Sequence, residues 1–238
     1  MSKRLKFACK HFLISALIGT LTALLIYYVW YPYPLNIAVG VDQIFLMFIG
    51  IDIIIGPILG FLVYKESKKN LKFDLFIVVL FQFSAFIFGL ISLEKARPAW
   101  IVFNLNQFEL ILKNEIILPA NKSNLKYKES SWFGPQWVST TPAKNITQKN
   151  NDIFDAVFNH VSTAQKVERY TDIRHAKSTI INKSIAIKEL SRFNEDVSIL
   201  QTIPEATKYL PLKSKLVDMT VLLDENGNAI KIVNLRPW

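Results

Sequence analysis

Three long runs of apolar residues fill the first part of the chain, at about residues 11–31, 42–64 and 74–93. Each run is long enough to cross the ~30 Å hydrocarbon core of a bilayer as a helix. The first run follows a basic start, as in a signal peptide. However, its apolar core of roughly twenty residues exceeds the 7–15 of a signal h-region, and no clear A-x-A cleavage site follows. The pattern therefore predicts a three-helix transmembrane region at 11–93 after a basic tail at 1–10.

The pattern changes in residues 94–238, where short alternating segments replace the continuous apolar runs. Residues 100–105 and 108–112 are rich in β-branched and aromatic residues, which predicts two strands at the start of this region. Residues 217–235 predict a hairpin whose turn contains Asn226 and Gly227. We expect the first and last strands to pair with one another.

Between these strands the pattern predicts helices and loops. Apolar residues at helical spacing predict an amphipathic helix with Asn151 or Asp152 as its N-cap, and the face consists of Ile153, Phe154, Val157, Phe158 and Val161. A second helix is predicted over 178–193. The polar and aromatic residues 119–142 predict loops, one short strand and a turn at 132–135. The region as a whole is predicted to be an α+β domain.

The second apolar run contains an ionisable residue, Asp52, which insertion scales penalise by roughly 2.5–3.5 kcal/mol at the centre of a membrane. Asp52, Gly56 and Gly60 recur every four residues and therefore share one stripe of the helix. Pro57 cannot donate to the carbonyl of Ile53, which predicts a kink. Asp52, Gly56, Pro57 and Gly60 are our candidate packing or partner surface. A docking notch, a proton site and a structural joint remain open as its role.

The other two apolar runs carry similar stripes of small or polar residues. The members are Ser15, Gly19 and Ala23 in the first run, and Gln82, Ala85 and Gly89 in the third. Small residues allow membrane helices to approach closely, because packing rather than the hydrophobic effect drives their association. The stripes can therefore face one another, or leave part of their surface for a transmembrane helix of a partner.

The net charge of +9 would suggest nucleic-acid binding if the basic residues were spread over a folded surface. Eight of them instead flank the apolar runs, namely Lys3, Arg4, Lys6, Lys10, Lys65, Lys68, Lys69 and Lys72. By the positive-inside rule they place the N-terminus and the second connection in the cytoplasm. Residues 94–238 then lie outside, and Trp30, Tyr31 and Tyr33 fit the outer aromatic belt. A lipid bilayer is the expected partner of this half, and nucleic acid is not.

Catalytic chemistry finds little support in the sequence. Residues 94–238 contain two histidines, His160 and His175, and no cysteine, which excludes a cysteine-based zinc site. Nucleophile-elbow and phosphate-loop motifs do not occur. An intramembrane aspartyl protease needs two facing carboxylates, and Asp52 has no equivalent in the other runs. The acid pair Asp152 and Asp155 is interpreted as solvated surface. We expect no enzymatic activity, no metal and no cofactor.

Five segments of the chain carry a resemblance to a known family. They are Asp52-Ile53-Ile54-Ile55-Gly56-Pro57-Ile58-Leu59, Lys68-Lys69-Asn70-Leu71-Lys72-Phe73-Asp74-Leu75, Ala96-Arg97-Pro98-Ala99-Trp100-Ile101-Val102-Phe103, Tyr209-Leu210-Pro211-Leu212-Lys213, and the ending from Asp218 to Trp238. In these segments the chain resembles the TfpX/TfpZ family of type IV pilin accessory proteins. The resemblance spans most of the chain and is strongest at 52–108.

The resemblance implies a multi-pass protein of the bacterial inner membrane whose C-terminal domain is periplasmic. It also implies a non-enzymatic role in pilus assembly, with the major type IV pilin as partner and the pilus assembly machinery as a further candidate. Membrane spans and a periplasmic domain would then bind the pilin together. The alternative is a membrane sensor or receptor with a ligand-binding periplasmic domain.

Overall fold

The computed structural model describes residues 2–119 and 126–238. Three of its helical segments are long and apolar enough to cross a membrane: Lys3–Trp30, Val41–Val63 and Leu71–Ala96. The prediction of three membrane helices followed by an α+β domain is confirmed. The first segment already begins at Lys3, capped by the Ser2 hydroxyl, so the basic residues of the N-terminus are helical.

The first two membrane segments contain π-helical turns. The first consists of α1 (Lys3–Leu24) and η1 (Leu25–Trp30), and the second of α3 (Val41–Gly50), η2 (Ile51–Ile55) and α4 (Gly56–Val63). A short helix, α2 (Leu35–Val39), lies between the two segments, and α5 (Leu71–Ala96) forms the third. The irregularity expected at Pro57 is therefore a π turn that ends just before Gly56.

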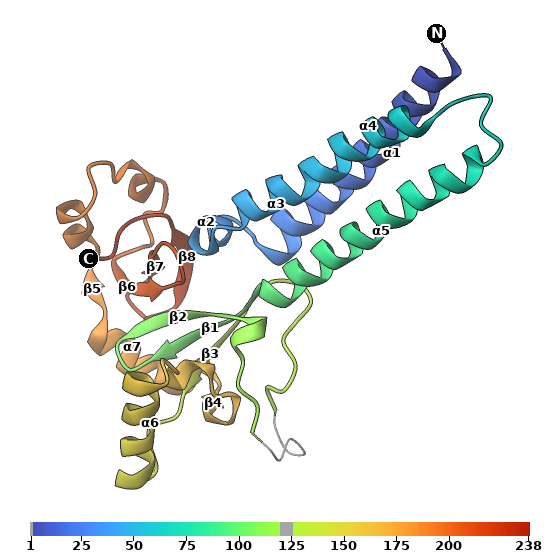
Figure 1. Cartoon of the computed structure of the whole chain (residues 1–238). Helices are drawn as coiled ribbons and strands as arrows, with labels where there is room; N and C mark the ends of the chain where they lie inside the picture. Colours follow the sequence, from blue (N-terminus) through green and yellow to red (C-terminus); the bar gives the residue numbers. More distant parts are fainter. Residues whose placement is uncertain (1, 120–125) are drawn as a thin grey trace.

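The two ends of the membrane bundle make different contacts, since only one of them lies beside the sheet (Figure 1). At the end far from the sheet, Lys3 pairs with Glu66, and the Arg4 guanidinium lies over the Phe61 ring. At the near end, α2 contacts the C-terminal half of the chain. The Ala38 carbonyl accepts hydrogen bonds from the Ser214 hydroxyl at 2.9 Å and from the Leu216 amide at 3.1 Å.

One mixed sheet forms the centre of the second half, in the order β4-β3-β1-β2-β6-β7-β8, with β5 also paired to β6. The strands are β1 (Pro98–Asn104), β2 (Gln107–Leu112), β3 (Gln136–Thr140), β4 (Tyr170–Thr171), β5 (Ile185–Ala186), β6 (Lys208–Lys213), β7 (Met219–Leu223) and β8 (Ala229–Val233). The predicted first and last strands share this sheet but do not pair directly. They are joined by β6, which runs parallel to β2 and antiparallel to β7.

Helices surround the sheet, and most of them are 3-10 segments of three to six residues. The α-helices are α6 (Ile146–Phe158) and α7 (Lys177–Lys183). The 3-10 turns are η3 (Lys113–Glu115), η4 (Thr163–Gln165), η5 (Val167–Arg169), η6 (Ile173–Ala176), η7 (Ile187–Arg192) and η8 (Ser198–Thr202).

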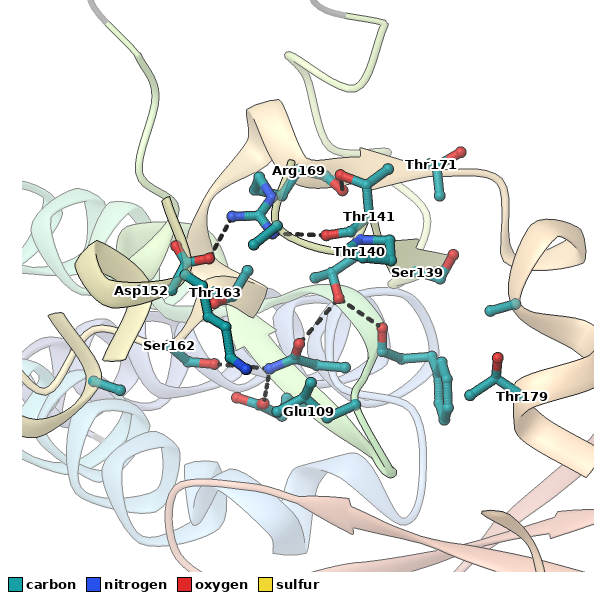
Figure 2. A pocket seen from close by; sticks show the side chains of 18 of the residues that line it. Glu109, Ser139, Thr140, Thr141, Asp152, Ser162, Thr163, Arg169, Thr171 and Thr179 are labelled. Atoms are coloured by element: carbon teal, nitrogen blue, oxygen red, sulfur yellow. Dashed lines mark hydrogen bonds and ion pairs between the residues drawn. The ribbon is translucent and has the colours of Figure 1, made fainter. Parts of the chain in front are cut away.

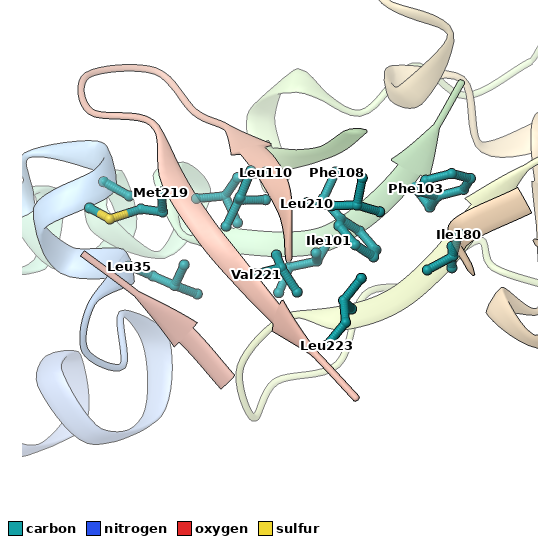
Figure 3. Packing of buried hydrophobic residues seen from close by; sticks show 12 residues of the cluster. Leu35, Ile101, Phe103, Phe108, Leu110, Ile180, Leu210, Met219, Val221 and Leu223 are labelled. Carbon is teal, nitrogen blue, oxygen red and sulfur yellow. The ribbon is translucent and has the colours of Figure 1, made fainter. Parts of the chain in front are cut away.

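The largest apolar core joins the sheet to the membrane region. Ile101, Phe108, Leu210 and Val221 pack together from four neighbouring strands, and Leu35 of α2 enters the same cluster (Figure 3). Because α2 connects the first two membrane segments, this core holds the sheet domain against the end of the bundle.

Two details of the predicted helices are wrong. The amphipathic helix begins six or seven residues earlier, at Ile146, because the Asn145 side chain caps it by accepting from the Gln148 amide at 2.8 Å. The predicted helix over 178–193 breaks at Ser184, whose backbone is extended. Residues 185 and 186 instead pair with β6, so a non-local strand contact overrides the local helical pattern.

Candidate functional site

The candidate surface on the second membrane segment lies inside the bundle. Asp52, Gly56, Pro57 and Gly60 are all buried by the protein's own helices. A Cβ atom on Gly56 would overlap the Gln82 amide of α5, and one on Gly60 would lie 2.9 Å from the Phe7 ring of α1. These glycines therefore allow side chains of the two neighbouring helices to approach the second segment.

A polar contact between the spans explains why Pro57 is tolerated. In a π-helical turn each carbonyl accepts from the amide five residues later, and for Asp52 that residue is Pro57, which has no N–H. Gln82 Nε2 donates to the Asp52 carbonyl at 2.7 Å instead. The sequence predicts an open carbonyl at Ile53, and the hydrogen bond between the spans is made at the carbonyl one residue earlier, that of Asp52.

Other members of the three small-residue stripes also meet inside the bundle. Gln82 Nε2 lies 3.3 Å from the Ser15 hydroxyl, and a Cβ on Gly19 would lie 2.8 Å from the Ile53 side chain. Two acceptors, Asp52 Oδ2 and Gln82 Oε1, are buried and have no hydrogen-bond partner within the described part of the chain. The sequence pattern identified Gln82 as a stripe residue but did not pair it with Asp52.

Helix α5 leaves most of its surface uncovered by the rest of the chain. Leu93 is its one buried residue, whereas the aromatic side chains of Phe76, Phe81 and Phe88 are exposed. In a bilayer these residues contact lipid or another transmembrane helix.

A cleft of about 980 Å³ lies in the sheet domain, between α6 and the end of strands β1 and β3 (Figure 2). Its floor is a network of buried polar side chains. Asn104 Nδ2 donates to Glu109 Oε1 at 2.8 Å, and the Thr140 hydroxyl donates to Asn104 Oδ1 at 2.9 Å. The network fixes the shape of the floor because its members satisfy one another.

Ion pairs attach α6 to the side of this cleft. Asp152 lies 2.6 Å from Arg169 Nη1 and 3.1 Å from Lys166 Nζ, and Asp155 lies 2.6 Å from Lys166 Nζ. Arg169 also donates to the Thr141 carbonyl at 2.7 Å. Burial alone would raise the pKa of Asp152, but hydrogen bonds and attraction from Arg169 and Lys166 outweigh it and lower that pKa. The interpretation of Asp152 and Asp155 as solvated surface is therefore wrong for Asp152, whose side chain is held between two cations and is only partly exposed.

The apolar face of α6 is directed away from the domain, which reverses the usual arrangement of an amphipathic helix. Ile153, Phe154, Val157 and Phe158 are between 53% and 67% exposed, whereas the side chain of Asp152, on the ion-paired face, is 15% exposed. The rings of Phe154 and Phe158 lie 4.7 Å apart and form one apolar patch. Clustered exposed aromatic residues of this kind mark interaction surfaces in soluble domains.

The two histidines of the domain line the cleft without forming a catalytic group. His175 Nδ1 lies 2.8 Å from the Thr171 hydroxyl, and His160 follows the end of α6 with a φ of 54°. Within residues 2–119 and 126–238, no three His, Cys, Asp or Glu side chains are grouped so that they could hold a metal ion.

A helical membrane bundle joined to a mixed sheet defines a membrane-anchored α+β protein, and sequence comparison identifies its family. The profile described as "Fimbrial assembly protein FimB" matches residues 1–40. A fimbrial assembly protein of serogroups C1 and C2 from Dichelobacter nodosus is 36% identical over 122 residues, which cover 49% of this chain and 93% of the relative. The chain belongs to the fimbrial assembly protein family.

Longer matches extend the relationship over nearly the whole chain. The serogroup I protein of Dichelobacter nodosus is 28% identical over 252 residues, covering 98% of this chain and 97% of the relative, and the serogroup E1 protein is 26% identical over 250 residues with the same coverage. No solved structure matches the chain. The resemblance to pilus accessory proteins is thus confirmed at the level of a role in fimbrial assembly.

Proposed function

We propose that this protein is an inner-membrane accessory factor that binds the major type IV pilin and assists its assembly into the pilus without catalysing a reaction. A pilin that waits in the inner membrane has one hydrophobic helix and a periplasmic head. Family membership supports the role in assembly, and the two uncovered apolar surfaces on α5 and α6 support the choice of partner.

The proposed orientation places the N-terminus in the cytoplasm and the sheet domain in the periplasm. The basic residues of the N-terminus and of the connection before α5 lie at the end of the bundle far from the sheet (Figure 1). Such clustering at one end is what the positive-inside rule predicts for the cytoplasmic face.

The observation that carries the proposal is that α5, a candidate membrane span, and α6, in the sheet domain, both leave apolar side chains exposed. Helix α5 offers exposed aromatic residues within the membrane, and α6 offers Phe154 and Phe158 beyond it. A partner with a membrane helix and a soluble head can contact both surfaces at once. Two modest contacts on one partner then reinforce each other through effective concentration.

We assign the surface around Asp52 a different role from α5. Gln82 and Phe7 already fill the space beside Gly56 and Gly60, which favours a structural joint over a docking notch. In this proposal the joint sets the position of α5, and the outer face of α5 binds the pilin helix.

Site-specific photocrosslinking in cells that produce the pilin tests the proposal. A crosslinking amino acid at Phe88 of α5 and another at Phe154 of α6 should each form an adduct with pilin. The matched control is Leu17, an exposed residue of the first span. Pilin adducts no more frequent at Phe88 and Phe154 than at Leu17 would contradict the proposal.

The cleft of about 980 Å³ favours a second candidate, a receptor that binds a small ligand in its periplasmic domain. Ala156 lines the cleft, whereas Phe154 is exposed on α6. Ala156→Trp should fill the cleft and abolish receptor function, whereas Phe154→Ser should weaken pilin binding. Pilus assembly that is lost in the first variant and normal in the second would favour the receptor.

A further inference from the structure

A second group of exposed aromatic residues lies in the loop before β3. Trp132, Phe133 and Gly134 form a turn, as predicted, and Gly134 adopts a left-handed φ of 71°. Two hydrogen bonds brace the turn: the Phe133 amide donates to the Ser131 hydroxyl at 3.0 Å, and the Ser131 amide donates to Gln136 Oε1 at 3.1 Å. The turn therefore has a defined shape and presents its aromatic residues from a fixed position.

This turn lies beside the last turn of the first membrane segment. The Trp132 ring packs edge to face on Trp30 with ring centroids 5.3 Å apart. The position that a Gly134 Cβ atom would occupy is 3.7 Å from the Val29 carbonyl oxygen. Since Val29 and Trp30 end a segment long enough to span a bilayer, the tip of the turn lies beside one end of a candidate membrane span.

Contact with the third segment places the base of the turn at the same level. Arg97 directly follows α5, and its Nη2 donates to the Ser130 hydroxyl at 3.4 Å. The turn is thus held at two points where the chain leaves the membrane, one on the first span and one on the third.

The side chains at the tip are not covered by the described part of the chain. Phe133 is 80% exposed and Trp132 is 50% exposed. Tyr28 and Tyr33, on either side of the end of the first span, are also exposed. Aromatic rings at the end of a membrane span favour the boundary between lipid headgroups and acyl chains, where Trp and Tyr are enriched in membrane proteins.

We propose that the Trp132–Phe133 turn inserts into the outer surface of the bilayer and anchors the sheet domain to lipid. The occupant of this apolar surface is the headgroup region of the membrane, because the contacts with Val29 and Trp30 place it there. Anchoring by Trp132 and Phe133 fixes the tilt of the domain and hence the direction of α6. This inference does not depend on the identity of the bound pilin.

Fluorescence from a single labelled cysteine tests the insertion. Cys9 is the one cysteine of the chain, and its replacement by serine gives a background for Phe133→Cys. A polarity-sensitive fluorophore is attached to this cysteine, and the full chain is reconstituted in phosphatidylethanolamine–phosphatidylglycerol vesicles without pilin. Phe158→Cys on α6 is the matched control, since it is also an exposed phenylalanine but lies on the helix that points away from the bundle (Figure 1).

The label at residue 133 should show a blue-shifted emission and lose most of its intensity to lipids that carry a nitroxide near the headgroup. The label at residue 158 should respond to aqueous iodide and not to these lipids. A label at residue 133 that iodide quenches as strongly as the control would overturn the proposal. Resistance to both quenchers would overturn it as well, because protein and not lipid would then cover the turn.

Discussion

The joint between α5 and the second span predicts that Gly56→Ala destabilises the membrane bundle. The added methyl group would overlap the Gln82 amide and displace it from the Asp52 carbonyl, which it now contacts at 2.7 Å. Because Pro57 supplies no N–H, that carbonyl would be left without a donor inside the membrane.

The expected change in the stability of Gly56→Ala combines two destabilising contributions with one stabilising contribution. A hydrogen bond between membrane helices contributes about 0.6–1.7 kcal/mol. Overpacking of a close contact typically costs about 1–3 kcal/mol. Replacing glycine by alanine in a helix gains up to about 1 kcal/mol. Gly50→Ala provides the control for this gain, because nothing lies within 4 Å of the position of its Cβ atom. We therefore expect Gly56→Ala to be about 2–4 kcal/mol less stable than Gly50→Ala.

Reversible unfolding in mixed micelles titrated with SDS measures this difference. The double variant Gly56→Ala/Gln82→Ala separates the two costs, because it removes the overlap along with the hydrogen bond. The double variant should be at least as stable as Gln82→Ala alone, because the new methyl group no longer meets the Gln82 amide. The effects of the two substitutions on stability are then not additive. Equal stability of Gly56→Ala and Gly50→Ala would refute the assignment of this site as a joint.

Two further predictions concern the attachment of α6. Asp152→Asn should cost about 1.5–3 kcal/mol, because it removes charge-assisted hydrogen bonds to the buried Arg169. Asp155→Asn should cost less, because this carboxylate is more exposed to water. Hydrogen exchange over residues 146–158 reports how firmly α6 is held, and protection should fall more in Asp152→Asn than in Asp155→Asn. Equal protection in the two variants would contradict this prediction. The lowered pKa of Asp152 means that its contribution is complete at neutral pH and is lost only as the pH falls below about 4, the ordinary range of an aspartate. In an acid titration, the emission of a fluorophore attached to α6 should therefore change as the helix detaches from the domain, and this change should be smaller in Asp152→Asn. An equal change in both proteins would disprove the role of Asp152.

Residues close in sequence carried enough information to predict much of the architecture. The three membrane segments, the hairpin near Gly227 and the turn at Trp132 follow from continuous apolar runs, alternation and turn-forming residues. These signals are local, because the length of an apolar run or the need for a left-handed φ does not depend on distant parts of the chain. The continuous helix predicted over 178–193 is wrong, since residues 185 and 186 in its middle pair with β6 from more than twenty residues away.

The candidate site depended more strongly on tertiary contacts. The pattern found the stripe of Asp52, Gly56 and Gly60, yet only the position of α5 showed that Gln82 fills it. The apolar stripe of α6 was also visible in the sequence, but periodicity cannot tell whether such a face is buried or exposed. Arg169 and Lys166 decide this by holding the helix through its polar side.

The sequence by itself therefore determined which segments enter the membrane, which end of the bundle is basic, and that this chain is related to fimbrial assembly proteins. The tertiary structure decided which apolar surfaces are covered. Burial of a helix face depends on what packs against it, and the packing partners here come from elements far apart along the chain. For this reason only the folded chain shows that the outer faces of α5 and α6 and the Trp132–Phe133 turn are exposed, which makes them the surfaces proposed for interaction.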